Sequence, residues 1–354
     1  MKINRKFFAA LRWGWTILKI LAIVFIAFIG YIQLTDFRPS DKVPIELRGN
    51  RHELENVDGT LSIITWNIGY AGLGKEMDFF YDGGEMVRPD YRQHKNYLKG
   101  ITEFLMANDS VEVFLLQEVD RNSRRSYEYN QMKHITDSLE RFSGVFAKNY
   151  DVPFVPLPVT SPMGKVDAGM ATFSKLRPKM TFRYALPQSH SWPMSLFMLD
   201  RAVIKSTFPF PDRKNLVVLN IHNSAYADEE AARAAELEVI KSIALEEYNK
   251  GNYVVIGGDW NQNPPDFKIQ SIPKGKETGF TLQDDYIGKE WKWVYDEHEA
   301  TNRSLKRPYS ESSKKTIIDF YLLSPNLTVE EVEVLEQNFR FSDHEPVYIR
   351  FRLD

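Results

Sequence analysis

Acidic, amide and histidine side chains repeatedly follow short apolar segments in this chain. They occur in Trp66-Asn67, Gln117-Glu118, Asn220-Ile221-His222, Gly258-Asp259-Trp260-Asn261, Ile318-Asp319 and Ser342-Asp343-His344. Taken singly, an Asn or Asp after a strand is most often a turn residue, and a lone histidine is more often structural than catalytic. Strand ends from one sheet edge converge, so the repetition favours one shared site.

Four of these residues carry carboxylic acids: Glu118, Asp259, Asp319 and Asp343. Clustered in a folded core they repel one another, and burying them is costly unless they pair with a cation or bind a metal. Mg²⁺ or Mn²⁺, hard divalent cations that take oxygen ligands, would relieve that repulsion. The histidines then supply general acid/base catalysis or hydrogen bonds to a transition state, and the amides supply neutral donors for phosphate oxygens.

Strands must position these side chains. Short β-rich segments predict strands at Leu61 to Trp66, Val111 to Leu116, Gly169 to Phe173, Ala202 to Ser206, Leu216 to Ile221, Tyr253 to Ile256, Ile317 to Leu323 and Val347 to Phe351. Helical patterns cover Tyr91 to Met106, Gln131 to Phe142 and Ala227 to Tyr248, and the last opens with acids that suit a helix N-terminus. This mixture predicts two sheets packed face to face, with helices outside and sites at the strand ends.

The motifs together resemble the endonuclease/exonuclease/phosphatase superfamily, which includes DNase I, abasic-site endonucleases, inositol polyphosphate 5-phosphatases and bacterial sphingomyelinases. The matching motifs, in the family's order, are Thr65-Trp66-Asn67, Leu116-Gln117-Glu118-Val119-Asp120, Asn220-Ile221-His222, Gly257-Gly258-Asp259-Trp260-Asn261, Ile317-Ile318-Asp319-Phe320 and Ser342-Asp343-His344. Each is weak alone, but six in order are jointly specific. The resemblance implies a four-layer α/β sandwich, two packed mixed β-sheets flanked by helices, and a membrane-anchored bacterial subgroup.

The resemblance also implies roles for individual residues. Glu118, with Asn67 beside it, looks like the primary site for Mg²⁺ or Mn²⁺, and Asp343 would complete the metal or water network. Asp259 would orient or deprotonate the attacking water. Asn261 would hold the phosphate and the nucleophile.

Two histidines complete the implied catalytic set. His344 would contact the scissile phosphate, with Asp319 orienting its ring and fixing its tautomer. His222 resembles a second histidine of the DNase-like and phosphatase branches, and it would stabilise the developing charge or protonate the leaving group. The carboxylate partner of His222 is not identifiable from the sequence, so a structural role for it stays open.

Two segments have no counterpart in the generic motif pattern. Arg124 and Arg125 follow Glu118 closely enough to border the site, where guanidinium groups bind a second phosphate or an anionic head group well. A solvated charged loop explains them equally well. Asp82-Gly83-Gly84 is a turn by its glycines.

An apolar segment from Trp13 to Leu34 is long enough to span a bilayer, and its uncharged part starts at Ile20. Basic residues precede it, so the positive-inside rule places the N-terminus in the cytoplasm and the rest outside the cytoplasm. The predicted organisation is a basic tail over residues 1–12, a transmembrane anchor over 13–34, a linker over 35–59 and a catalytic domain over 60–354. A cleaved signal peptide is the alternative, but its apolar stretch is usually shorter.

Composition narrows the function classes. The chain has no cysteine, which excludes disulfides, thiolate metal sites and cysteine nucleophiles. The first 35 residues carry five basic and no acidic residues, so the net charge of −3 leaves −8 on the remainder. That charge favours a lipid or small-molecule phosphate over nucleic acid, whose binding needs a basic track. An extracytoplasmic nuclease remains the first alternative and a non-catalytic binding module the second. No protein partner can be inferred.

Overall fold

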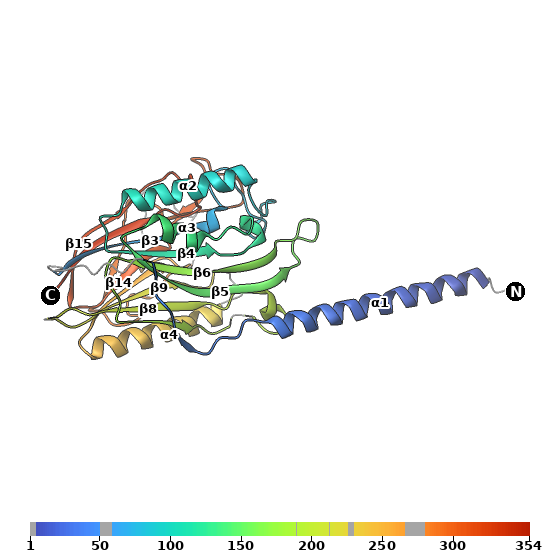
Figure 1. The fold of residues 1–354 in the computed structure, drawn as a ribbon, viewed down its shortest axis with the longest axis horizontal. Helices are drawn as coiled ribbons and strands as arrows, with labels where there is room; N and C mark the ends of the chain where they lie inside the picture. The colour runs from blue at the N-terminus through green and yellow to red at the C-terminus, as the bar shows by residue number, and fades with distance from the viewer. Residues whose placement is uncertain (1–4, 50–58, 189, 212, 226–229, 266–279) are drawn as a thin grey trace.

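The computed structural model describes residues 5–354 except 50–58, 189, 212, 226–229 and 266–279. Helix α1 (Arg5–Thr35) projects from one side of a mixed α/β domain, as Figure 1 shows. The helix has high hydropathy over Leu11–Thr35, and most of its side chains in that span lie exposed. By length and composition it suits a membrane span or a signal sequence.

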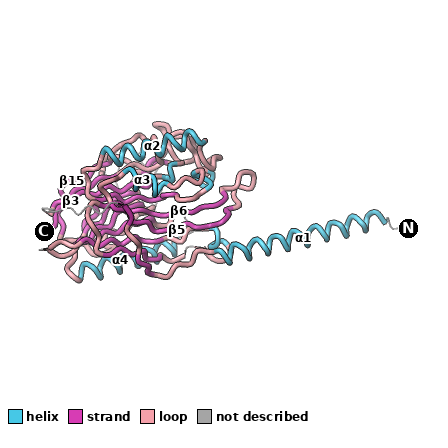
Figure 2. Tube along the Cα trace, viewed as in Figure 1, coloured by secondary structure: helices cyan, strands magenta, loops and turns pink. Residues whose placement is uncertain are grey.

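Two seven-stranded mixed sheets form the centre of the domain (Figure 2). The first sheet has the order β1-β7-β8-β9-β10-β14-β11. Its strands are β1 (Lys42–Pro44), β7 (Met180–Ala185), β8 (Ala202–Phe208), β9 (Leu216–His222), β10 (Tyr253–Asp259), β14 (Asp319–Leu323) and β11 (Lys292–Val294).

The second sheet has the order β15-β16-β3-β4-β6-β5-β2. Its strands are β15 (Leu327–Val334), β16 (Val347–Leu353), β3 (Thr60–Asn67), β4 (Val113–Asp120), β6 (Gly164–Ser174), β5 (Ser143–Val155) and β2 (Arg48–Gly49). A separate two-stranded hairpin consists of β12 (Asn302–Arg303) and β13 (Lys315–Thr316).

Alternating side chains along the strands create four layers. In β3, Ile63 packs between the two sheets, whereas its neighbour Ile64 packs toward α2 (Tyr91–Ala107) and α3 (Gln131–Ser138). This follows from the two-residue period of a strand. Helix α4 (Glu230–Asn249) covers the other face of the first sheet (Figure 1). The order is therefore helices, sheet, sheet and helix, and it confirms the predicted four-layer α/β sandwich.

All eight predicted strands are present, with shifts at their ends. The other eight strands, β1, β2, β5, β7, β11, β12, β13 and β15, were not predicted. Strand β15 was missed because its middle is polar and exposed at a sheet edge. Helix α3 ends at Ser138 rather than at the predicted Phe142. The chain turns after Ser138, and Phe142 is buried with its ring centroid 5.2 Å from that of Phe114. The predicted linker 35–59 contains β1 and β2, which pair with β7 and β5.

A pair of buried amides joins the two sheets. Gln117 in β4 donates from Nε2 to Oδ1 of Asn220 in β9 at 2.8 Å, and Asn220 Nδ2 donates to the carbonyl of Ala171 in β6 at 3.0 Å. Both amides are fully buried, and a buried polar group costs stability unless it is hydrogen-bonded. The pair therefore fixes the two sheets against each other near their site-bearing ends.

We expect Asn220→Ala to lower the free energy of unfolding by about 1–3 kcal/mol, because it removes the shortest of the three hydrogen bonds of Gln117 Nε2 and the side-chain donor to the carbonyl of Ala171. Urea unfolding of the detergent-solubilised chain, followed by tryptophan fluorescence, measures this. Thr160→Ala, at an exposed position, serves as the control and should change stability by less than about 0.5 kcal/mol. A control-sized effect at Asn220 would contradict a structural role for the amide pair.

Candidate functional site

Strand register places three site residues side by side in the first sheet. Asp259 at the end of β10 pairs with His222 at the end of β9 and with Asp319 at the start of β14. The glycine before Asp259 is required, since a Cβ on Gly258 would lie 2.1 Å from the carbonyl oxygen of Ile221. Its φ of +145° is also one that other residues rarely adopt.

The second sheet contributes Asn67 and Glu118 from the ends of β3 and β4. The β4 ladder is irregular between Leu116 and Val119, and Glu118 there has a φ of 54°, in the left-handed region. Such bulges turn a side chain out of its normal direction in the ladder. Asn67 then bridges the two sheets, because its Nδ2 donates to Glu118 at 3.1 Å and to Asp259 at 3.0 Å.

The loop before β16 is held beside β3 by two hydrogen bonds. Ser342 Oγ donates to the carbonyl of Asn67 at 2.7 Å, and Trp66 Nε1 donates to the carbonyl of His344 at 2.9 Å. Trp66 and Ser342 are buried, so Asp343 and His344 are fixed at the end of β3. The conspicuous Thr65-Trp66-Asn67 segment therefore anchors the final motif as well as carrying a site residue.

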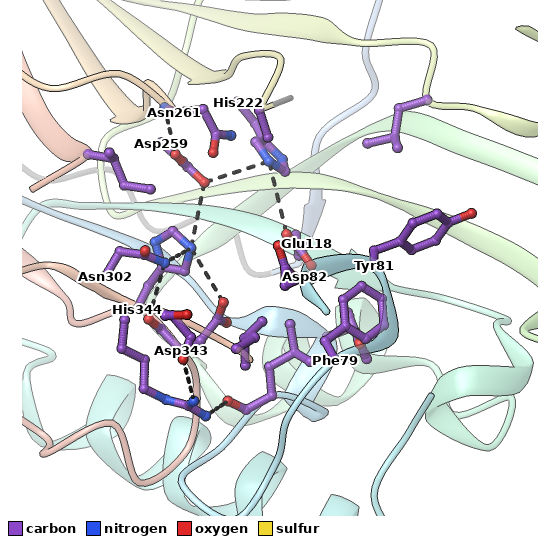
Figure 3. A pocket seen from close by; sticks show the side chains of 18 of the residues that line it. Phe79, Tyr81, Asp82, Glu118, His222, Asp259, Asn261, Asn302, Asp343 and His344 are labelled. Atoms are coloured by element: carbon purple, nitrogen blue, oxygen red, sulfur yellow. Dashed lines mark hydrogen bonds and ion pairs between the residues drawn. The ribbon is translucent and has the colours of Figure 1, made fainter. Parts of the chain in front are cut away.

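His344 and Asp259 occupy the centre of the arrangement, as Figure 3 shows. His344 Nδ1 lies 2.8 Å from Asp319 Oδ2, which gives the orienting contact that the resemblance implied. Asp259 Oδ2 lies 3.8 Å from His344 Nε2 and 3.6 Å from His222 Nε2. Glu118 Oε1 lies 4.0 Å from the same nitrogen of His222. Acid and imidazole groups thus alternate across the site.

The two histidines have opposite electrostatic surroundings. Burial alone would lower the pKa of His344, but the carboxylates of Asp319, Asp259 and Asp343 outweigh it and raise this pKa well above its ordinary value. Burial, the guanidinium of Arg201 and the charge of His344 lower the pKa of His222 well below its ordinary value. The surroundings therefore favour the charged ring of His344 and the neutral ring of His222, and such a separation often assigns acid and base roles.

The carboxylates also have perturbed acidity. Burial raises the pKa of Asp259 to about 6, and the charge of Asp319 adds to this effect while His344 opposes it. Burial raises the pKa of Asp343 to about 7, again opposed by His344 and increased by Glu118. The charge of His344 therefore does not fully offset the burial of Asp259 and Asp343.

The donor set fits a hard divalent cation. Asp319 Oδ1 is buried without a hydrogen-bond partner, and carboxylate oxygens of Asp259 and Asp319 lie within 4.8 Å of each other and of a ring nitrogen of His344. The surroundings of His344 favour its protonated ring, which has no lone pair for a metal, so the carboxylate oxygens are the candidate ligands. Glu118 and Asp343 supply further oxygens beside this group. Asn67 Oδ1 accepts from the N–H of Gly69 at 3.0 Å, which leaves its Nδ2 directed at the carboxylates of Glu118 and Asp259. Oxygen-rich sites of this kind suit Mg²⁺ or Mn²⁺.

A pocket of about 540 Å³ lies over these residues. Its polar end is lined by Glu118, His222, Asp259, Asn261, Asp343 and His344, whereas Asn67 and Asp319 lie behind this lining. Its apolar wall consists of Tyr70, Leu73, Phe79, Tyr81, Met163, Met198 and Leu199. Basic groups from the β12–β13 hairpin region, Arg303, Lys306, Lys314 and Lys315, border another part. The pocket can hold a phosphate at one end and an apolar group at the other.

The two predicted substrate arginines lie differently. Arg125 lines the pocket, but its Nε and Nη2 contact the carboxylate of Asp120 at 3.1 and 2.9 Å, and its guanidinium covers the ring of Tyr70 at 3.8 Å. Arg124 is not among the pocket-lining residues, and its side chain lies near Gly164. Only Arg125 is therefore placed to meet a bound molecule.

Several site residues gave no recognisable sequence signal. The amide of Asn302 lies 3.0 Å from His344 Nε2. Arg303 is buried and donates to the carbonyls of Leu73 and Gly74 at 3.0 and 2.8 Å, so it holds the loop beneath the pocket. Asp82 was explained as a turn residue, yet it lines the pocket and burial raises its pKa to about 6.

Comparison with known proteins defines the class. Residues 64–344 match the model of the Endonuclease/Exonuclease/phosphatase family, and the chain belongs to this family. The matched range contains all six motifs in full. Its name covers enzymes that hydrolyse phosphoester bonds, and its members typically depend on a divalent metal. No curated protein matches the chain.

Solved structures share the fold at low identity. An endonuclease/exonuclease/phosphatase from Beutenbergia cavernae has a TM-score of 0.58 and 17% identity, over 83% of this chain and 72% of that one. The human nocturnin catalytic domain with bound sulfate has a TM-score of 0.52 and 14% identity, over 88% and 97%. D. rerio TDP2 complexed with single strand DNA product has a TM-score of 0.50 and 14% identity, over 83% and 100%.

We expect Asp319→Asn to lower the pKa of His344 by about 1–3 pH units, because it removes the nearest opposite charge. Proton NMR titration of the histidine Cε1–H signals, assigned with His344→Gln, measures this. Asp109→Asn, at an exposed carboxylate that pairs with Arg141, is the matched control. An unchanged titration of His344 in the Asp319 variant would show that the pair does not hold the imidazolium.

Proposed function

We propose that this chain is a membrane-anchored, divalent-metal-dependent phosphoesterase that cleaves a phosphodiester or phosphomonoester by attack of water. The observation that carries the proposal is the convergence of Asp259, Asp319 and His344 with Glu118 and His222 at one end of both sheets. A structural role does not explain three buried carboxylates around one imidazole, since burial of charge is costly. Family membership supports the same reaction class.

The chain's own residues divide the work. Asp259, whose pKa is raised to about 6, is a stronger base than an ordinary carboxylate and would orient and deprotonate water. The main-chain N–H of Asn261 donates to Asp259 Oδ1 at 2.9 Å and holds it in place. His344, kept protonated by Asp319, would donate to a phosphate oxygen and stabilise the charge that develops there.

Glu118 and Asp343 are the residues that would hold the cation, with Asn67 positioning Glu118. When bound, a divalent cation neutralises charge on the phosphoryl group. His222 is neutral and contacts Asp259 and Glu118. It would hydrogen-bond to the substrate near the leaving group. Of the two roles that the resemblance implied, this is stabilisation of the developing charge.

The anchor in this proposal is α1, with the N-terminus in the cytoplasm and the domain outside it. The basic residues before the apolar span support that orientation. The retained helix is favoured over a cleaved signal peptide because Ile32, near its C-terminal end, is fully buried against the domain. Cleavage after the apolar span would remove that packing.

A nuclease is the second candidate, and one observation favours it. Lys306, Lys314 and Lys315 border the pocket, and basic groups there would contact a phosphate backbone. The acidic remainder of the chain and the apolar pocket wall favour a smaller or lipid phosphate instead.

The full-length chain in detergent should hydrolyse at least one phosphoester with Mg²⁺ or Mn²⁺ and none with EDTA. The measurement is a screen of supercoiled DNA, RNA, sphingomyelin, phosphoinositides and simple phosphomonoesters. Turnover that is confined to lipid or small phosphates supports the main proposal. DNA nicking at comparable enzyme levels would instead make the chain an anchored nuclease.

Two variants separate metal binding from catalysis. Glu118→Gln should weaken Mg²⁺ binding at least tenfold, measured by calorimetry, because a cation ligand loses its charge.

His344→Ala should leave Mg²⁺ affinity within about threefold while turnover falls about 100-fold or more. Asp109→Asn controls for the loss of a carboxylate elsewhere. Full turnover in the His344 variant would contradict the assigned mechanism.

A further inference from the structure

The C-terminal end of α1 is packed onto the domain. The ring of Phe28 stacks on Phe197 at 6.0 Å and meets Phe154 edge-on at 6.2 Å. Trp192 Nε1 donates to Gln33 Oε1 at 2.9 Å. These contacts fix the position of α1 relative to the chain segments around Phe154 and around Trp192 and Phe197. The side of the domain that carries these segments therefore faces the membrane that α1 would enter.

Those two segments differ sharply from the rest of the chain. In a sequence with 26% charged residues, residues 152–164 and 190–199 contain no Lys, Arg, Asp or Glu. The first is the tip of the β5–β6 hairpin, and the second surrounds the short helix η4 (Met194–Phe197). We call these two segments the apolar lip.

Large apolar side chains of the lip are exposed. Val159 is 81% exposed, Trp192 64%, Met194 52% and Leu157 41%. In Figure 1 the β5–β6 hairpin projects on the side of the domain from which α1 leaves. Exposed apolar patches of this kind mark interaction sites, and tryptophan is enriched at the boundary between membrane and water.

The lip is continuous with the wall of the pocket. Met163 from the first segment and Met198 and Leu199 from the second line the pocket. Tyr150, another lining residue, donates from its hydroxyl to the carbonyl of Phe197 at 3.0 Å. Apolar surface therefore extends from the pocket to the end of α1 without an intervening charged residue in either segment.

We propose that the apolar lip rests in the surface of the bilayer that α1 enters, and that the pocket takes the phosphoester of an amphiphile from that bilayer. The head group occupies the polar end beside His344, and the first apolar atoms of the molecule contact Met163, Met198 and Leu199. This inference rests on the proposed phosphoesterase function and adds the class of substrate and its route. The lip contains no Lys or Arg, so insertion of apolar side chains, rather than attraction to anionic lipid, drives the contact.

The cysteine-free sequence makes a direct test practical. Val159→Cys and Met194→Cys, each labelled with the environment-sensitive fluorophore NBD, are reconstituted as full-length protein in phosphatidylcholine vesicles. The control is Glu330→Cys on the exposed edge strand β15, which Figure 1 places on the opposite side of the domain. We expect a blue shift and quenching by spin-labelled lipid at positions 159 and 194 only. Salt and added anionic lipid should leave the signal unchanged.

Absence of lipid quenching at both lip positions would overturn the proposal, and this readout requires no turnover. A second copy of the chain as the occupant would give a shift that grows with the protein-to-lipid ratio and is not quenched by the lipid spin label. That outcome also overturns the proposal. Failure of the phosphoesterase function is seen separately, as absence of Mg²⁺-dependent hydrolysis of the soluble diester bis(4-nitrophenyl) phosphate.

Turnover tests the substrate class. The double variant Val159→Glu with Met194→Glu places charge on exposed positions that do not line the pocket. We expect the ratio of lipid to soluble-diester turnover to fall at least about tenfold, with vesicles containing sphingomyelin or phosphoinositides as lipid substrates. An unchanged ratio, or hydrolysis of the soluble diester with no turnover of any of these lipids by the parent chain, would overturn the amphiphile assignment.

Discussion

Repulsion among three buried carboxylates around His344 is the interaction on which the site depends. Asp259, Asp319 and Asp343 are nearly or fully buried, and together they keep the imidazole charged. A flexible scaffold would let them separate and become hydrated. Here two of them lie on adjacent, hydrogen-bonded strands, and the third lies in a loop held by Trp66 and Ser342. The rigidity of the sheets maintains an arrangement that is unfavourable without a cation.

The sequence was sufficient to predict the layers and the polar end of the site. Apolar strands such as the one ending at His222 leave a clear pattern, and each motif residue sits at or beside a strand end. The two-residue period then decides which side chains face the other sheet. The confirmed sandwich follows from these local signals together with the family resemblance. Roles of individual residues remain predictions, although the Asp319–His344 contact has the geometry that they require.

The rest of the site depends on contacts that no local pattern records. Arg303 holds carbonyl groups of residues 73 and 74, more than two hundred positions earlier in the chain. Asn302 reaches His344 because a two-stranded hairpin folds over the pocket. The sequence allowed Arg125 to be either a phosphate ligand or part of a solvated charged loop. In the structure Asp120, five residues before it, accepts hydrogen bonds from its Nε and Nη2. Such long-range pairings arise only when the tertiary structure forms.

The packed end of α1 has a consequence for selectivity. A flexible linker between an anchor helix and a domain lets the domain rotate, so its active site can lie at different distances from the membrane. The contacts of Phe28, Ile32 and Gln33 instead fix α1 rigidly to the domain. For a chain anchored as proposed, the catalytic groups stand at one fixed height above the hydrocarbon. The selectivity of the enzyme among lipids would then depend partly on the distance between the phosphorus atom and the acyl chains of each lipid. The enzyme would encounter these lipids by lateral diffusion in the membrane.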